Sequence, residues 1–335
     1  MLETIHQGLP LPAFFLHEVE QGVKYNMVDG QQRTRTIVGY LNGLLKDDKG
    51  KKYSADTDNA IYQYQLAVIV IHDVPEESGI IRDYYYRVNK YGMKVNRPEE
   101  IRSKYLNTPL QNLVESIARS DSWAELQLFT QAKIDRLADE DFIAELLTLQ
   151  KHGITDKKLQ VDKFYADTTF GEADATALKA DFNDVIDHIK TLNDHFPLAK
   201  TRYKQRNDFY TLYSFIRSSS GLAEDELVRM YDILARVGPS ISPSREECFT
   251  LQEYAIHCVS QSHLKSARER RLEFFNALLL NREPKPMGRE PDNDRNPMLA
   301  DVMRFFKLTN SDLVQAGDYF LMSTEELPGL PEQIQ

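Results

Sequence analysis

The residues from Asp29 to Arg33, in the order DGQQR, are those whose types and spacing best suit chemistry. Alternating apolar and polar residues over 23–27 predict a strand before them, and an amphipathic stripe over 37–45 predicts a helix after them. A strand that passes through a glycine straight into a helix leaves the first helical N–H groups unpaired. With the positive end of the helix dipole, these groups form a site for an anion. The pattern therefore predicts a turn that holds a phosphate group.

The side chains of this turn suggest roles through their chemistry. Gly30 lets the backbone turn tightly and approach a ligand, and Arg33 can present a planar fork to phosphate oxygens. Asp29 would repel a phosphate, so we expect it to hold a Mg²⁺ ion that bridges the phosphates or to position the attacking water. Gln31 and Gln32 are expected to orient that water or to donate to the phosphates. Asp-Gly is also a common turn pair, so an ordinary turn before an ordinary helix is the alternative.

Length and composition indicate an ordinary globular protein with room for two domains. The chain has 335 residues, of which 41% are hydrophobic and 27% charged. The net charge of −10 argues against a protein that coats DNA nonspecifically, because neutralising phosphates needs a basic face. The longest apolar run, 66–71, is far too short to span a membrane, and the first residues lack the features of a secretory signal. We therefore expect a cytoplasmic protein without a membrane partner.

The two cysteines offer little chemistry. Cys248 and Cys258 lie ten positions apart in a segment with a helical pattern, and His257 and His263 are nearby. A structural zinc site needs about four ligands at close spacings. We therefore expect no metal site here.

The pattern of elements changes along the chain. Strand signals over 13–17, 23–27 and 61–72 alternate with the helix predicted over 37–45. Helix signals dominate from residue 96 onward. The expected fold class is α+β, with a small α/β domain over 1–105 and a larger all-helical domain over 106–310. The tail, 311–335, has an apolar middle and is expected to dock on the body or on a partner.

Helix starts in the second half are marked by four pairs of residues at the spacing of a capping box. The pairs are Asn96 with Glu99, Thr108 with Gln111, Thr250 with Glu253, and Ser266 with Glu269. Acidic residues at 139–141 also predict a helix N-terminus, where negative charge is favoured.

The DGQQR segment resembles the signature of the GmrSD-type family of prokaryotic defence proteins. This family includes the N-terminal domains of type IV restriction enzymes and of phosphorothioate-sensing SspE proteins. Segments 3–18, 82–102 and 205–215, and the arginine-rich helix around Arg268 and Arg271, also resemble that family. The likeness covers most of residues 1–280.

The resemblance implies a ParB/sulfiredoxin-like fold for the first domain, with the phosphate-holding turn at the same junction of strand and helix. It implies binding and hydrolysis of a nucleoside triphosphate with Mg²⁺, coupled to recognition or cleavage of modified foreign DNA. The implied catalytic residues are Asp29, Gln31, Gln32 and Arg33. The implied nucleotide-binding residues are Gly30, Thr34, Arg87 and Asn89.

Two features depart from the family pattern. Members usually carry an upstream strand with a Gln-Arg element and a nearby Trp, and this chain begins too late to include it. Part of the nucleotide pocket is therefore expected to be missing or supplied in another way. The HNH nuclease half of many relatives is also absent, since Asp187 and His188 lie in a helical stripe without a second His and Asn in order. We therefore expect a separate nuclease subunit to do any cleavage.

Three basic clusters are candidate DNA-binding surfaces. The first, 82–104, holds seven Lys or Arg against three acids and is interleaved with tyrosines. The other two contain the candidate DNA contacts Lys200, Arg202, Lys204, Arg206, Lys265, Arg268 and Arg271. The alternative for each cluster is a solvated helix face. Convergence of all three clusters around Arg33 would favour DNA binding.

These observations support two hypotheses of different classes. The first is a sensor subunit of an anti-phage or modification-dependent restriction system that binds and hydrolyses a nucleoside triphosphate and acts with DNA and a separate nuclease. The second is a non-catalytic DNA-binding or scaffold module that keeps the fold without turnover. A homo-oligomer is compatible with both.

Overall fold

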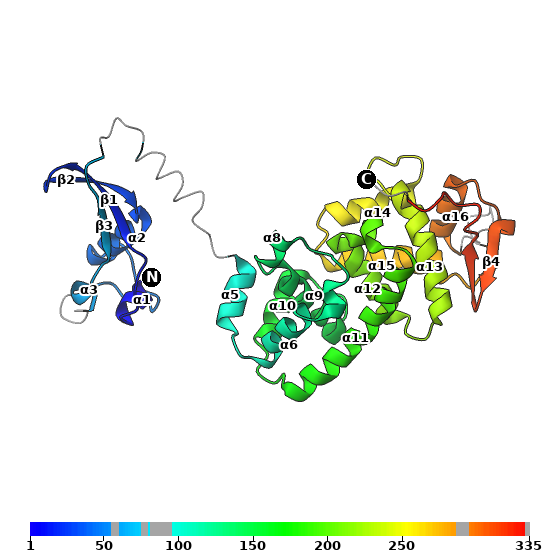
Figure 1. The fold of residues 1–335 in the computed structure, drawn as a ribbon, viewed down its shortest axis with the longest axis horizontal. Helices are drawn as coiled ribbons and strands as arrows, with labels where there is room; N and C mark the ends of the chain where they lie inside the picture. The colour runs from blue at the N-terminus through cyan, green and yellow to red at the C-terminus, as the bar shows by residue number, and fades with distance from the viewer. Residues whose placement is uncertain (55–59, 75–79, 81–95, 286–294, 332–335) are drawn as a thin grey trace. The chain divides into compact units, whose positions relative to one another are not determined.

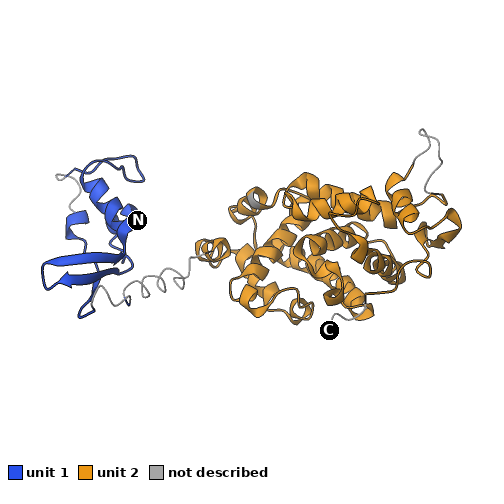
Figure 2. Ribbon diagram, turned by 90° about the horizontal axis from the view of Figure 1, so that it is seen from above, with its two compact units in different colours: residues 1–94 blue, residues 95–335 orange. Residues whose placement is uncertain are grey.

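The chain forms two compact units, residues 1–94 and 95–335 (Figure 2). The computed structural model describes residues 1–54, 60–74, 80, 96–285 and 295–331. Unit 1 holds the expected turn, and unit 2 holds the helical half. The boundary lies before the predicted one at 105, because helix α5 (Arg97–Lys104) packs on helix α9 (Ala138–His152) of unit 2.

Unit 1 is a three-stranded sheet with short helices (Figure 1). Its described elements are α1 (Leu2–His6), β1 (Phe14–Glu20), β2 (Lys24–Asp29), α2 (Gln31–Leu41), α3 (Ala60–Gln63) and β3 (Val68–Ile71). The strand order is β2-β1-β3, with β1 antiparallel to β2 and parallel to β3. Its main buried apolar cluster is small and consists of Leu2, Ile5, Tyr40 and Ile61.

The first two predicted strands are confirmed, and two other predictions for unit 1 are wrong in part. The predicted strand 61–72 contains helix α3 followed by the four-residue strand β3. The predicted helix over 37–45 ends at Leu41, because Gly43 turns the chain with a φ of +68°. Leu44 is consequently 78% exposed, and the buried side chain of α2 is that of Tyr40.

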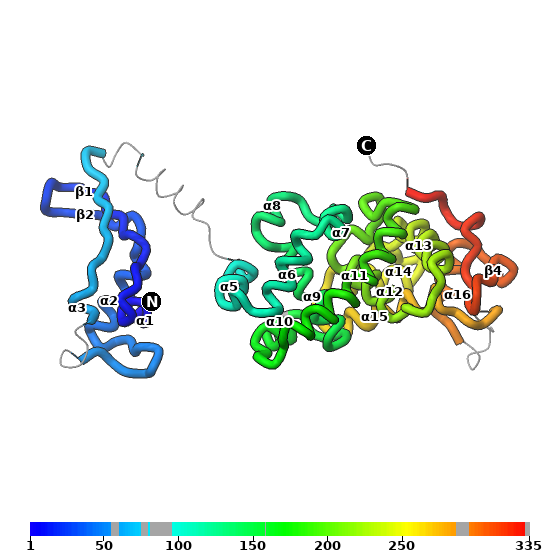
Figure 3. The backbone as a smooth tube through the Cα atoms, turned by 60° about the horizontal axis from the view of Figure 1, so that its bottom comes forward, coloured from blue at the N-terminus to red at the C-terminus, as the bar shows by residue number. Residues whose placement is uncertain are grey.

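Unit 2 is a bundle of helices around one large core (Figure 3). Its further helices are α6 (Pro109–Ala118), α7 (Asp121–Ala124), α8 (Gln131–Ile134), α10 (Lys157–Tyr165), α11 (Glu172–His195), α12 (Arg206–Ser218), α13 (Glu224–Val237), α14 (Phe249–Val259), α15 (Lys265–Leu279) and α16 (Pro297–Phe305). Short 3-10 turns are η2 (Leu198–Lys200), η3 (Arg202–Lys204), η4 (Gly238–Ser240) and η6 (Asn310–Asp312). Helices α9, α11 and α12 pack on one another in this core.

The C-terminal tail forms part of unit 2. Strands β4 (Leu313–Ala316) and β5 (Tyr319–Met322) form an antiparallel hairpin, and the N–H of Phe320 donates to the carbonyl of Asn281 at 2.7 Å. Ala316, Leu321 and Met322 belong to the main core. The expected docking on the body is therefore confirmed, and the unit is mostly rather than wholly helical.

Some helix starts are capped by side chains close in the sequence, and others by carboxylates distant in the sequence. Asn96 and Glu99 form the predicted capping box, and the Thr108 side chain caps α6 as expected. Helices α14 and α15 begin one residue before the predicted Thr250 and Ser266. Carboxylates far along the chain accept from their first N–H groups instead, as Asp301 does for Thr250 at 2.9 Å.

Among the described helices, none combines the length and apolar character needed to cross a bilayer.

Candidate functional site

The junction of β2 and α2 has the predicted strand–glycine–helix geometry. Gly30 is the N-cap of α2 and has a φ of +104°, a conformation that favours glycine. A Cβ built on Gly30 would lie 2.5 Å from Cδ1 of Phe14, in the neighbouring strand β1. Two independent constraints, the backbone angle and the phenyl ring, therefore require glycine at this position.

The first turn of α2 offers unpaired backbone donors. The N–H of Thr34 donates to the carbonyl of Gly30 at 2.9 Å and begins the helical ladder. Within the described residues, the N–H groups of Gln31, Gln32 and Arg33 have no acceptor, and no side chain caps the helix. Three donors and the positive end of the helix dipole therefore meet at one place.

Arg33 lies at this turn but is already engaged. Its Nη2 donates to Oδ2 of Asp29 at 2.7 Å, and its Nη1 donates to the carbonyl of Pro12 at 2.5 Å. The guanidinium also lies 4.8 Å from the centre of the Phe14 ring. We expected a fork open to a ligand, and the structure instead shows a guanidinium that is held between the carboxylate, the carbonyl and the ring. The neighbouring backbone amides are not occupied in this way.

The other predicted residues of the turn are distributed around it. The Asp29 side chain is 39% exposed, and Gln31 and Gln32 are both exposed. The Gln31 side-chain amide makes a long contact of 3.4 Å to the carbonyl of Met27. The hydroxyl of Thr34 contacts the sulfur of Met27 at 3.4 Å, so this side chain packs against β2. Arg87 and Asn89 lie outside the described residues.

Asp29 is the candidate ligand for Mg²⁺. In the part of the chain that the structure describes, no three His, Cys, Asp or Glu side chains are arranged to hold a metal ion. Magnesium in nucleotide sites is often bound by one or two carboxylates, with phosphate oxygens and water completing the shell. The exposed Asp29 fits that limited role, since only its Oδ2 is paired.

Four of the candidate DNA contacts are held by partners within unit 2, which corrects the expectation of a DNA-facing surface at these positions; they are Arg202, Arg206, Arg268 and Arg271. Arg268 and Arg271 are 4% and 1% exposed. Arg271 donates to the carbonyls of His257 and Ser262 at 2.6 and 3.1 Å. Nε of Arg202 donates to buried Asp208 at 2.8 Å. The arginines therefore satisfy buried acceptors rather than face a ligand.

Arg206 and Arg268 meet on one face of α9. Arg206 pairs with Asp141 at 2.7 Å and with Glu145 at 2.6 Å, and Arg268 also pairs with Glu145. Lys157 contacts the same two acids, at 2.8 and 3.3 Å. Burial alone would raise the pKa of Glu145, but the three cations outweigh it and hold the pKa below its ordinary value.

We name this cluster of Asp141, Glu145, Lys157, Arg206 and Arg268 the ionic core. The ionic core was not predicted from the sequence, because residues 139–141 were interpreted only as a helix N-terminus. A signal was present: Asp141 and Glu145 stand four residues apart, on the same face of a helix that is otherwise largely buried.

The remaining candidate DNA contacts are lysines with more exposure. Lys204 and Lys265 are exposed, and Lys265 lies 3.6 Å from Glu269. Lys200 is half-buried, with its Nζ 5.7 Å from the centre of the Phe196 ring. From the first basic cluster, Arg97, Arg102 and Lys104 are described; the two arginines pair with acids of unit 2, and Lys104 is exposed with its Nζ 5.2 Å from the centre of the Tyr105 ring.

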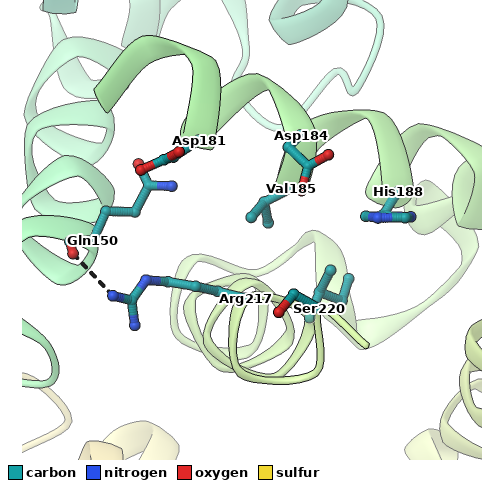
Figure 4. Close-up of a pocket in the computed structure, with 8 residues that line it drawn as sticks. Gln150, Asp181, Asp184, Val185, His188, Arg217 and Ser220 are labelled. Atoms are coloured by element: carbon teal, nitrogen blue, oxygen red, sulfur yellow. Dashed lines mark hydrogen bonds between the residues drawn. The ribbon is translucent and has the colours of Figure 1, made fainter. Parts of the chain in front are cut away.

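A polar groove in unit 2 was not predicted. It lies between α11 and α12 (Figure 4) and has a volume of about 310 Å³. Its lining includes Asp181, Asp184 and His188 from α11, and Arg217 donates across one end to the carbonyl of Gln150 at 2.9 Å. The groove combines residues from three separate segments, so no local motif marks it in the sequence.

The cysteines are buried and unpaired by disulfides. Burial raises the pKa of both Cys248 and Cys258 to about 12. Both thiols therefore stay protonated and unreactive at neutral pH.

Comparisons with family models, curated proteins and solved structures find nothing that matches this chain. What the chain does is therefore inferred from its residues and their geometry.

Proposed function

We propose that the β2–α2 turn binds the phosphates of a nucleoside triphosphate. The observation that carries this proposal is the uncapped first turn of α2, where three N–H groups lack acceptors among the described residues. Exposed donors of this kind are met by water or by a ligand, and the helix dipole favours an anion in the place of water. An anion at this turn would supply the acceptors.

Other helices of the chain support this interpretation by contrast. Helix α9 has three acids in its first turn, α13 also has three, and α5 and α6 have side-chain caps. Helix α2 has neither an acid nor a cap, and its first turn carries Arg33, a cation at the positive end of the dipole. Helices α8 and α10 also lack both features, so what distinguishes the start of α2 is its left-handed glycine N-cap directly after a strand.

The pair of Asp29 and Arg33 suggests how the turn changes on binding. A triphosphate would compete with Asp29 for the guanidinium, because phosphate oxygens accept the same planar fork. Asp29 would then be free to hold Mg²⁺, which supplies charge neutralisation to the phosphates. Gln31 and Gln32, both exposed at the turn, are the candidates for orienting an attacking water. Hydrolysis is therefore part of the proposal.

The biological role follows from the resemblance of the DGQQR motif. We propose a cytoplasmic sensor subunit of a prokaryotic anti-phage or modification-dependent restriction system. A ParB/sulfiredoxin-like fold for unit 1 is part of this proposal, and so are modified DNA and a separate nuclease as partners. The alternative, a DNA-binding scaffold without turnover, loses support because two of its candidate arginines are buried and two more are paired with carboxylates of unit 2.

Nucleotide binding tests the proposal. Calorimetric titration of the full chain with ATP, GTP, CTP and UTP, each with Mg²⁺, should detect at least one ligand. Arg33→Lys keeps the charge but removes the fork, and we expect about tenfold weaker binding or worse. Arg35→Ala is the matched control, since Arg35 is an exposed arginine of the same helix.

Failure has a clear form. No binding by any of the four nucleotides, or equal binding by the wild type and the Arg33→Lys variant, would overturn the proposal. Release of phosphate that persists in Asp29→Asn would reject the role of Asp29 in turnover while leaving the binding site in place.

A further inference from the structure

Strand β3 has the sequence of a central strand. Residues 66–71, LAVIVI, are all apolar and contain no charge, proline or glycine. Strands that read as continuous apolar runs are usually covered on both faces, as in the middle of a parallel sheet. Strands with one solvated face alternate polar and apolar residues instead.

Among the described strands of the structure, β3 nevertheless lies at an edge of the sheet. The order β2-β1-β3 leaves it with β1 as its neighbour, to which it is parallel. Val68 is 48% exposed and Ile69 is 47% exposed. Because successive side chains point to opposite faces, both faces of β3 present apolar surface to solvent.

The outer backbone of β3 is also open. The carbonyl of Ala67 accepts from the N–H of Phe14 at 2.8 Å, so the backbone of Ala67 faces β1. Backbone groups alternate sides along a strand, and those of Val68 and Val70 therefore point away from β1. Within the described residues these outward groups have no hydrogen-bond partner. An apolar strand with open donors and acceptors is a template for another strand.

The opposite edge of the sheet is different. Strand β2 has Lys24 and Asn26 exposed along it, and polar or charged residues of this kind discourage further pairing. The sheet can therefore grow on one side only. If two copies pair through the same edge, β3 to β3, the assembly closes as a dimer. If they paired through two different edges, copies could continue to add and form an open filament.

We propose that β3 pairs with β3 of a second copy of this chain, antiparallel about a twofold axis. The two sheets then form one six-stranded sheet with both copies of β3 at its centre, the position that their sequence suits. A second copy is the favoured occupant, because β3 is the described strand that offers an apolar run and open backbone groups together. The exposed Leu66 and Tyr62 would extend the contact.

The direction of the backbone groups fixes the register. Hydrogen-bonded pairs of an antiparallel ladder need two residues that both point outward, so Val68 pairs with Val70 of the second copy. Ile69 then lies opposite Ile69 of the second copy in a non-hydrogen-bonded pair, where the two Cα atoms are about 4.5 Å apart. Because β1 lies between β3 and the β2–α2 turn, this pairing uses none of the residues of the turn.

A cysteine at the axis tests the proposal on the full chain. Two Cα atoms at that separation are within the range that a disulfide spans. We expect Ile69→Cys to give a covalent dimer under mild oxidation, while Asn26→Cys on the opposite edge stays monomeric. The native Cys248 and Cys258 are buried and do not interfere.

A second variant keeps the outcome clear. Val68→Lys places a charge on the open edge, and sedimentation velocity should show a lower dimer fraction than wild type at equal concentration. Circular dichroism checks that the variant folds. A wild type that stays monomeric at all concentrations, or an Ile69→Cys variant that gives no covalent dimer, would overturn the proposal. A dimer that Val68→Lys does not weaken would also overturn it.

Discussion

The two units differ in how completely their polar groups are paired and their apolar surfaces are buried within the unit. Unit 2 buries a large core, and its ionic core pairs every one of its charges. Unit 1 has a small apolar cluster of four buried residues, an uncapped helix and an apolar edge strand. The groups that unit 1 leaves open, backbone donors and apolar surface, are those that a ligand or another chain can satisfy. The ionic core of unit 2 is thus paired within the unit, and we propose that unit 1 is completed by what it binds.

The same comparison explains why arginines of the two units have different roles. Arg268 in unit 2 is buried and links α15 to α9 through its ion pair with Glu145. Arg33 in unit 1 is 19% exposed, beside amides that have no acceptor among the described residues. In the proposed function a phosphate displaces Asp29 from Arg33, and the released carboxylate, already 39% exposed, is solvated. Displacing Glu145 would leave a buried charge unpaired.

The largest effect is expected from breaking the ionic core. Glu145→Ala leaves Arg206, Arg268 and Lys157 without their shared partner, so the free energy of unfolding should fall by roughly 3–5 kcal/mol. Urea denaturation at pH 7 measures this. Glu273→Ala removes an exposed partner of Arg270 and should cause no measurable change. Equal effects of the two variants would remove the contrast between buried and surface pairs.

The pH dependence of this effect has a definite sign. Because the folded-state pKa of Glu145 is lowered, its contribution is fully present above the ordinary glutamate pKa. The contribution is lost as the pH falls through the folded-state value. The difference between wild type and Glu145→Ala should therefore shrink in acid, and a constant difference would contradict the assignment.

Much of the local structure could be predicted from the sequence. The strands around DGQQR follow from alternation, and the caps at Asn96 and Thr108 follow from residues within three positions of each other. The candidate turn was located for the same reason, since a strand, a glycine and a helix start are adjacent in the chain.

Interactions between distant residues could not be predicted in this way. Helix α15 is capped by Asp156, more than one hundred positions away, and the fork of Arg33 is held partly by the carbonyl of Pro12. The arginine clusters were interpreted as candidate surface patches because the sequence gives the positions of the charges. It does not show which distant carboxylates pair with them in the fold. Burial against α9 decided their role.

A smaller effect is expected at the turn itself. Gly30→Ala combines a left-handed backbone with a clash against Phe14, whereas Gly22→Ala combines a similar backbone, at a φ of +67°, with open space. Both variants should lose about 1–2 kcal/mol from the backbone, and Gly30→Ala should lose about 1–3 kcal/mol more from the clash. Hydrogen exchange of the amides in β1, β2 and α2 measures the local opening free energy. Equal losses would show that Phe14 yields without cost.

The smallest expected effect tests most directly whether the open amides at the start of α2 form a binding site. Gln32→Glu places an acid in the first turn of α2 and should stabilise the free helix by about 0.3–1 kcal/mol through the dipole. The same carboxylate should weaken triphosphate binding, because it repels the phosphates and occupies the open end. Val38→Glu, at an exposed position nearer the other end of α2, should show the opposite sign for stability and little effect on binding. Hydrogen exchange and calorimetry measure the two quantities. If Gln32→Glu stabilised the helix without weakening the nucleotide, the open amides would be a structural gap rather than a binding site.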